Sequence, residues 1–181
     1  MKWFFRVIGV VFLLFVGMIV MGYLSGSTLS VERSIEIDGY ADEIYPYLED
    51  LEAAQQWSSW YASDPDAEYL FGGADYGVGA TVVWRTHGST ADDAALINSE
   101  EITAAQPPEF VQTALLMNGE KASAIYAVTP LDAGSLVYIQ FERELGGFPY
   151  LKRLQKGRLE KKFGNEFEAA LQRLQTIIAS N

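Results

Sequence analysis

The chain has 181 residues, which suits one compact domain with a short additional segment. It carries 13 Lys and Arg against 24 Asp and Glu, a formal net charge of −11, with one histidine and no cysteine. This composition excludes a disulfide scaffold, Cys-ligated metals and a thiol nucleophile. The acidic balance argues against a nucleic-acid partner. We therefore expect no metal and no cofactor.

The first part of the chain is strongly apolar, because residues 7–24 contain no charge. At about 1.5 Å per residue, this helix would span roughly 27 Å, close to a hydrocarbon core of about 30 Å. Trp3 and Tyr23 lie where interfacial aromatics are expected. The pattern predicts a transmembrane anchor over residues 1–25 that contacts the membrane through residues 3–24.

A cleaved signal peptide is the alternative interpretation of this segment. Signal peptides have shorter apolar regions of about 7–15 residues, and Ser25-Gly26-Ser27-Thr28 matches a cleavage site poorly. Lys2 and Arg6 precede the apolar run, and the next basic residue is Arg33. The positive-inside rule then predicts a cytoplasmic N-terminus, and in a bacterium an inner-membrane protein with a periplasmic domain.

We expect a short linker over residues 26–30 and one domain over residues 31–181. Residues 29–38 alternate between apolar and polar side chains, which is typical of a half-buried strand. Early acids and an apolar stripe predict a helix from residue 41, and a second short helical piece is expected over residues 52–57.

The middle of the domain contains short alternating segments separated by turn residues. Asn118-Gly119 predicts a two-residue hairpin turn, because a type I′ turn needs a positive φ at both central residues. Such close spacing implies an antiparallel sheet. The expected strands lie near residues 68–71, 79–86, 94–103, 109–117, 121–129 and 135–143.

After Gly146-Gly147, apolar residues recur at intervals of three and four, which predicts a long amphipathic helix. Gly157 and Gly164 are expected to weaken it. The sequence thus predicts an α+β fold, with an antiparallel sheet of about seven strands curved around a long C-terminal helix and one transmembrane helix in front.

Four stretches carry a resemblance to a known family: residues 31–60, 77–84 (GVGATVVW), 135–142 (SLVYIQFE) and 163–175 (FGNEFEAALQRLQ). With them, residues 29–178 resemble the START-like helix-grip (SRPBCC) superfamily, in its bacterial polyketide cyclase/dehydrase and lipid-transport branch. The resemblance implies an apolar cavity between sheet and C-terminal helix that holds lipids, sterols or polycyclic molecules. It fixes no activity, because the branch includes both enzymes and carriers.

Large side chains on the inward faces are the candidates for lining such a cavity. Ordinary core packing is the alternative for all of them, and a gating role is a further hypothesis for the aromatic residues at the helix–sheet junction. The candidates are Trp57, Trp60, Trp84, Tyr126, Ile139, Phe141, Phe163 and Phe167.

Arg33 and Arg143 fall on the inward face by the strand alternation, near strand ends. A buried charge is costly unless it is paired. Each is therefore expected either to pair with a carboxylate, such as Glu101 or one on the helix, or to orient a ligand headgroup at a polar rim.

Other motifs give no catalytic site. Gly77-Val78-Gly79 lacks the third glycine of a dinucleotide fingerprint, and the acidic segment 64–68 lacks the glycine of a calcium loop. His87 has Asp92 and Asp93 nearby in sequence but no convincing nucleophile.

Residues 152–162 contain six basic side chains, whereas residues 25–120 have a net charge of −16. This run predicts either a solvated helix face or a contact surface for anionic headgroups or for a protein. We expect the protein to bind a hydrophobic small molecule or lipid. A polyketide cyclase/dehydratase-like enzyme and a filled-core protein-interaction domain are the alternatives.

Overall fold

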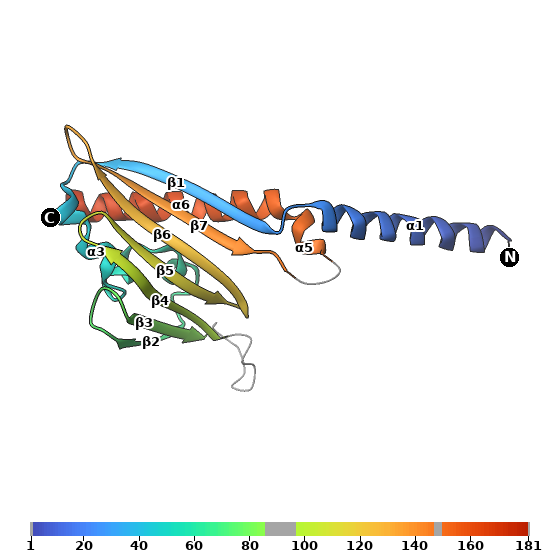
Figure 1. Cartoon of the computed structure of the whole chain (residues 1–181), viewed down its shortest axis with the longest axis horizontal. Helices are drawn as coiled ribbons and strands as arrows, with labels where there is room; N and C mark the ends of the chain where they lie inside the picture. The colour runs from blue at the N-terminus through green and yellow to red at the C-terminus, as the bar shows by residue number, and fades with distance from the viewer. Residues whose placement is uncertain (1, 86–96, 147–149, 181) are drawn as a thin grey trace.

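The computed structural model describes residues 2–85, 97–146 and 150–180. Its strands form one antiparallel seven-stranded sheet in the order β1-β7-β6-β5-β4-β3-β2 (Figure 1). The strands are β1 (Thr28–Ile37), β2 (Glu68–Gly73), β3 (Ala80–Arg85), β4 (Ile97–Gln106), β5 (Phe110–Met117), β6 (Glu120–Pro130) and β7 (Ser135–Glu144). The predicted α+β helix-grip fold is confirmed.

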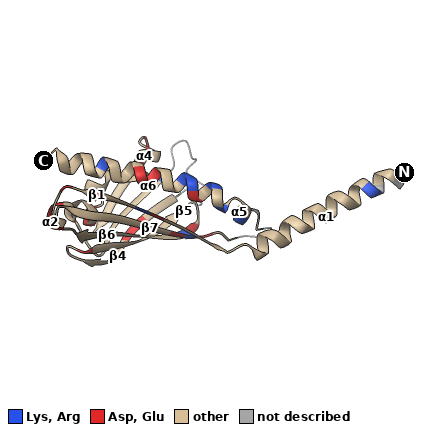
Figure 2. Ribbon diagram, turned by 90° about the horizontal axis from the view of Figure 1, so that it is seen from above, with Lys and Arg blue, Asp and Glu red and all other residues tan. Residues whose placement is uncertain are grey.

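The helices lie before, between and after the strands. They are α1 (Lys2–Leu24), α2 (Ala41–Ile44), α3 (Pro46–Glu49), η1 (Ala53–Gln56), α4 (Ser59–Ser63), α5 (Leu151–Leu154) and α6 (Lys156–Ala179). The long helix α6 runs along one face of the sheet (Figure 2). Its apolar stripe is buried against that face through Phe163, Phe167, Ala170, Leu171 and Leu174.

The turn between β5 and β6 has the predicted geometry, because Asn118 and Gly119 adopt φ values of 51° and 76°. This turn sets the register in which Met117 lies opposite Glu120.

Neither Gly157 nor Gly164 interrupts the C-terminal helix, because α6 continues through both residues. The break lies earlier, at Gln155, between α5 and α6. Gly164 serves close packing, since a β-carbon there would collide with the guanidinium of Arg33 on β1. The tertiary contact thus explains this glycine better than helix propensity does.

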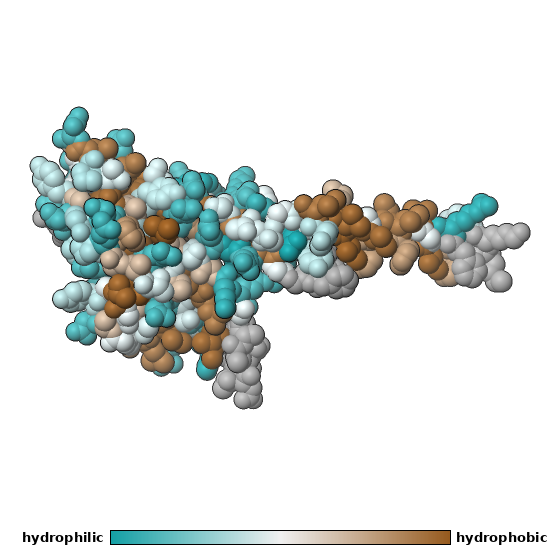
Figure 3. Space-filling view, in the orientation of Figure 1, coloured by the Kyte–Doolittle hydropathy of each residue, from teal (hydrophilic) through white to brown (hydrophobic). Residues whose placement is uncertain are grey.

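The N-terminal helix α1 projects away from the domain and is apolar along most of its length (Figure 3). Its segment Arg6–Leu24 is long and apolar enough to cross a membrane and is almost entirely exposed. A signal sequence shares these properties, so the structure establishes an exposed apolar helix that suits either role. His87, Asp92 and Asp93 lie outside the described residues.

Candidate functional site

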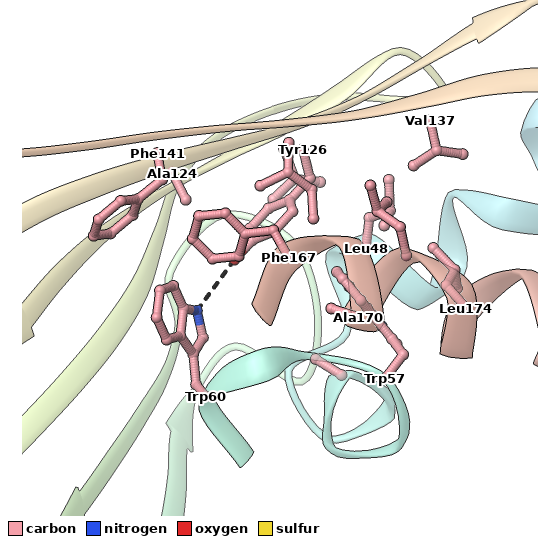
Figure 4. Packing of buried hydrophobic residues seen from close by; sticks show 14 of the residues in the cluster. Leu48, Trp57, Trp60, Ala124, Tyr126, Val137, Phe141, Phe167, Ala170 and Leu174 are labelled. Carbon is pink, nitrogen blue, oxygen red and sulfur yellow. Dashed lines mark hydrogen bonds between the residues drawn. The ribbon is translucent and has the colours of Figure 1, made fainter. Parts of the chain in front are cut away.

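Four predicted cavity residues form one aromatic cluster between α4, β7 and α6. Trp60, Phe141, Phe163 and Phe167 all contact one another, with ring centroids 5.1–6.4 Å apart. All four are buried. Figure 4 shows the rings of Trp60, Phe141 and Phe167 pointing toward one another between the sheet and α6.

Three further candidates, Trp57, Tyr126 and Ile139, lie next to this cluster. The ring of Trp57 meets that of Tyr126 edge-on, with centroids 5.6 Å apart, and Ile139 lies opposite Tyr126 in the β6–β7 register. The Trp57 indole donates to the Tyr47 carbonyl at 2.9 Å, and its own carbonyl accepts from Arg173 Nε at 3.0 Å. Trp57 is therefore held between α3 and α6.

Trp84 lies apart from the other candidates, on β3 near the opposite edge of the sheet. Its ring is 6.0 Å from that of Tyr69, which is in turn 4.6 Å from that of Tyr61. These aromatics connect β2 and β3 to α4. The eight candidates thus form two groups, which α4 joins through its consecutive residues Trp60 and Tyr61.

A polar centre lies within this apolar interior. The Trp60 indole Nε1–H donates to the Tyr126 hydroxyl at 3.3 Å, and the Tyr126 hydroxyl lies near the Glu100 carboxyl on β4. Glu100 is only 3% exposed, and no ion pair to it is found among the described residues. The Thr113 hydroxyl on β5 is also buried and forms no hydrogen bond of ordinary geometry. The centre is therefore a buried carboxyl without a described cationic partner.

Burial dominates the protonation of this centre. It raises the pKa of Glu100 from 4.5 to about 7, although the nearby hydroxyls of Thr113 and Tyr126 favour the charged form. Burial, and then the nearby Glu100 carboxylate, raise the pKa of Tyr126 well above its usual value. Glu100 therefore exchanges its proton near neutral pH, while Tyr126 stays a hydroxyl.

Glu100 was not among the residues predicted from the sequence, although a signal for it was present. Along β4 the inward side chains are Asn98, Glu100 and Ile102, in the alternation that a half-buried strand requires. The expected partner for an inward arginine, Glu101, is the next residue and is exposed on the opposite face. Because Glu100 and Glu101 are adjacent acids, the sequence alone did not show which of the two side chains is buried.

The two arginines reach the inward face as predicted, but neither forms a described ion pair with Glu101 or with an acid of α6. Arg143 pairs with Glu120, which also binds Lys152. Arg33 donates to the Glu32 carbonyl at 2.6 Å and packs against Gly164 of α6.

Each arginine also lines an open surface hollow, Arg33 between β1 and α6 and Arg143 at the ends of β6 and β7. Burial opposes the charge of Glu120, but hydrogen bonds from Lys152 and Arg143 outweigh it and lower the pKa of that carboxyl.

Within residues 2–85, 97–146 and 150–180, no group of three or more metal-ligating side chains is found.

Comparison with protein families gives one match. The family model described as polyketide cyclase / dehydrase and lipid transport matches residues 28–179, which span every strand and α6. Among curated proteins, no significant sequence match is found.

Solved structures with the same fold include proteins of different roles. A Staphylococcus aureus protein of unknown function has a TM-score of 0.61 at 10% identity and covers 84% of this chain and 94% of its own. Truncated norcoclaurine synthase from Thalictrum flavum has a TM-score of 0.61 at 12% identity, covering 87% and 98%. The di-domain ARO/CYC StfQ of the steffimycin biosynthetic pathway has a TM-score of 0.58 at 13% identity, covering 84% and 52%. At these identities the similarity shows the fold alone.

Proposed function

The chain belongs to the polyketide cyclase/dehydrase and lipid transport family, and from this membership we propose that its helix-grip domain binds a hydrophobic small molecule or lipid between the sheet and α6. The observation that carries the proposal is Glu100, a buried carboxyl without a described cationic partner among apolar side chains. Such a group is costly to bury, and perturbed buried carboxyls are typical of functional sites. A ligand with one polar group would meet Glu100 and Tyr126 and place its apolar part against the aromatic cluster.

A ligand that reaches the polar centre through the aromatic cluster requires one of its rings to move, because these rings already contact one another. Trp60 is the side chain best suited to this movement. It lies on α4, a helix of five residues, whereas Phe141, Phe163 and Phe167 belong to the long elements β7 and α6. Rotation of Trp60 would break its hydrogen bond to Tyr126 and expose the polar centre, which is a gating role.

We propose that α1 anchors the protein, with residues 1–25 in and beside the bilayer and the binding domain after them. The linker expected over residues 26–30 overlaps β1, which pairs with β7 from Thr28 onward, so residues 26–27 form the link. The length and exposure of Arg6–Leu24 support this arrangement. The basic residues Lys2 and Arg6 favour a cytoplasmic N-terminus, so the domain would lie outside the cytoplasm, at the periplasmic face of a bacterial inner membrane.

Native mass spectrometry of the full-length protein, gently extracted from its membrane, tests the binding proposal. We expect the wild type and Glu101→Leu, a matched change on the exposed face, to retain an apolar adduct that Glu100→Leu loses. An adduct retained equally by Glu100→Leu would contradict the role of Glu100. A wild-type protein that has no adduct and takes up nothing from a lipid extract would contradict ligand binding itself.

A catalytic role is the second candidate, and the pKa of about 7 for Glu100 favours it. A general acid or base works best when its pKa lies near the operating pH, and a cyclase- or dehydratase-type reaction needs such proton transfers. Glu100→Gln separates the two functions, because the amide keeps hydrogen bonding but cannot exchange a proton. Retained binding with lost conversion of the bound molecule would indicate an enzyme.

A further inference from the structure

The domain end of α1 is packed against α5. The rings of Tyr23 and Tyr150 meet edge-on with centroids 5.7 Å apart. A β-carbon on Gly22 would lie only 2.7 Å from the Tyr150 carbonyl oxygen, so this approach requires glycine. Arg153 donates to the carbonyls of Leu145 at 2.9 Å and Tyr23 at 3.5 Å. These contacts hold α5 beside the last turn of the apolar helix.

This position sets the level of α5 relative to a bilayer. The apolar segment Arg6–Leu24 ends one residue after Tyr23, so a membrane crossed by α1 has its headgroups beside α5. This step rests on the proposed anchoring role of α1. In Figure 2 the ribbon positions of Lys and Arg gather on α5 and the first turns of α6, at the end of the domain nearest α1.

The basic side chains at this level remain available to a partner. The side chain of Lys152 is 64% exposed and that of Lys156 is 36% exposed. Lys152 shares Glu120 with Arg143, so two cations face one carboxylate. Lys156 meets Glu160 only at 3.8 Å, as an i,i+4 pair on the helix surface, where such pairs contribute little.

Exposed apolar side chains accompany these charges. Tyr23, Leu24 and Leu154 are 65%, 76% and 39% exposed. Basic groups beside exposed aromatic and aliphatic groups are typical of segments that lie at a membrane interface, where the former meet headgroups and the latter enter the acyl boundary.

We propose that Tyr23, Leu24, Lys152, Leu154 and Lys156 form a headgroup surface that binds anionic phospholipids of the membrane that α1 crosses. The domain is then docked on the bilayer, with the Asn118-Gly119 end of its sheet toward the lipid. Each basic residue near an anionic leaflet shifts this docking equilibrium about fivefold, the factor that corresponds to about 1 kcal/mol.

The test measures how close the domain lies to vesicles of defined composition. Because the chain has no cysteine, Asn165→Cys on the exposed face of α6 provides a single labelling site. Energy transfer from this label to headgroup-labelled lipid is measured for the full-length protein in phosphatidylcholine vesicles and in vesicles that also contain phosphatidylglycerol. The measurement is repeated at about 0.1 M and about 1 M salt, because this increase shortens the Debye length from about 10 Å to about 3 Å.

We expect stronger transfer in anionic vesicles at low salt, and Lys152→Gln/Lys156→Gln should weaken docking about 25-fold. Lys161→Gln/Lys162→Gln is the matched control. It removes the same charge, but Lys161 lies about 7.5 Å along α6 from Lys156, close to one Debye length at about 0.1 M salt, so its effect should be smaller. Equal transfer in neutral and anionic vesicles, or equal effects of the two double variants, would overturn the headgroup surface.

Vesicle flotation separates this outcome from failure of the anchor. If the protein floats with neutral vesicles at high salt and the energy transfer is the same for neutral and anionic vesicles, the anchor is supported and the headgroup surface is rejected. If the protein floats with anionic vesicles but not with neutral ones, the anchor is rejected and the headgroup surface is supported. If it floats with neither, both are rejected. Adduct retention in the Lys152→Gln/Lys156→Gln variant reports separately on ligand binding.

Discussion

Trp60 and Tyr126 are joined by a hydrogen bond of 3.3 Å between the indole Nε1–H and the phenolic oxygen, although 66 positions separate them in the chain. The bond links α4 to β6 beneath α6. The Tyr126 hydroxyl that accepts it lies beside the buried carboxyl of Glu100. The bond is the contact that closes the proposed route to the polar centre.

Tyr126→Phe should lower the free energy of unfolding by about 1–3 kcal/mol, because it leaves the buried Trp60 donor without its acceptor. It should also raise the pKa of Glu100 above about 7, since the Tyr126 hydroxyl favours the charged carboxylate. Chemical denaturation across a pH series measures both effects. A variant as stable as the wild type, with an unchanged pH profile, would contradict the polar centre described here.

The stability of the protein should depend on pH through Glu100. Its pKa is raised in the folded state, so the neutral carboxyl favours folding below about pH 4.5, and this contribution is lost as the pH rises to about 7. The loss is on the order of 3 kcal/mol. In denaturation experiments at a series of pH values, the free energy of unfolding of the wild type should fall by this amount between about pH 4.5 and about pH 7, and that of Glu100→Gln should not. Glu101→Gln, on the exposed face, should show the same fall as the wild type.

Glu100→Leu should unfold at a higher denaturant concentration than the wild type at pH 8, because it removes a buried charge without a described cationic partner. A gain of about 1–2 kcal/mol is expected. Greater stability with loss of the bound molecule would mark Glu100 as a functional group that is retained at a cost to the fold. Reduced stability would instead indicate a structural carboxyl.

Glu120→Ala should destabilise the domain by about 1–2 kcal/mol, because it leaves the half-buried Arg143 and the neighbouring Lys152 without their shared carboxylate. Glu160→Ala removes the same charge from a surface pair with Lys156 at 3.8 Å and should cost less than about 0.5 kcal/mol. Thermal unfolding of the two variants compares them directly, and equal melting temperatures would show that Glu120 has no special role.

The two glycines of α6, Gly157 in the first turn and Gly164 farther along, should respond differently to alanine. A β-carbon on Gly157 meets nothing within 4 Å, so Gly157→Ala should stabilise the protein by about 1 kcal/mol through helix propensity. Gly164→Ala forces the Arg33 guanidinium, the far end of a flexible side chain, to move, so its gain should be smaller than that of Gly157→Ala. Equal gains from both substitutions, measured by denaturation, would show that Arg33 adjusts freely.

The sequence by itself determined the order of the elements, the antiparallel sheet, the hairpin at Asn118-Gly119 and the apolar N-terminal helix. These features depend on period-two or period-3.6 patterns and on local turn chemistry, which act over a few neighbouring residues. The same patterns placed Arg33 and Arg143 on the inward face of their strands.

Only the tertiary structure decided which inward side chains meet. Glu100 and Tyr126 lie on β4 and β6, with β5 between them, so their approach depends on the register of two strand pairs and on the sheet's curvature. Glu120 pairs with Arg143 and Lys152 because the start of β6, the end of β7 and α5 lie close together beside α1. A repeating pattern fixes the face on which a residue lies, but its partner across the sheet is set by long-range packing that no local stretch of sequence contains.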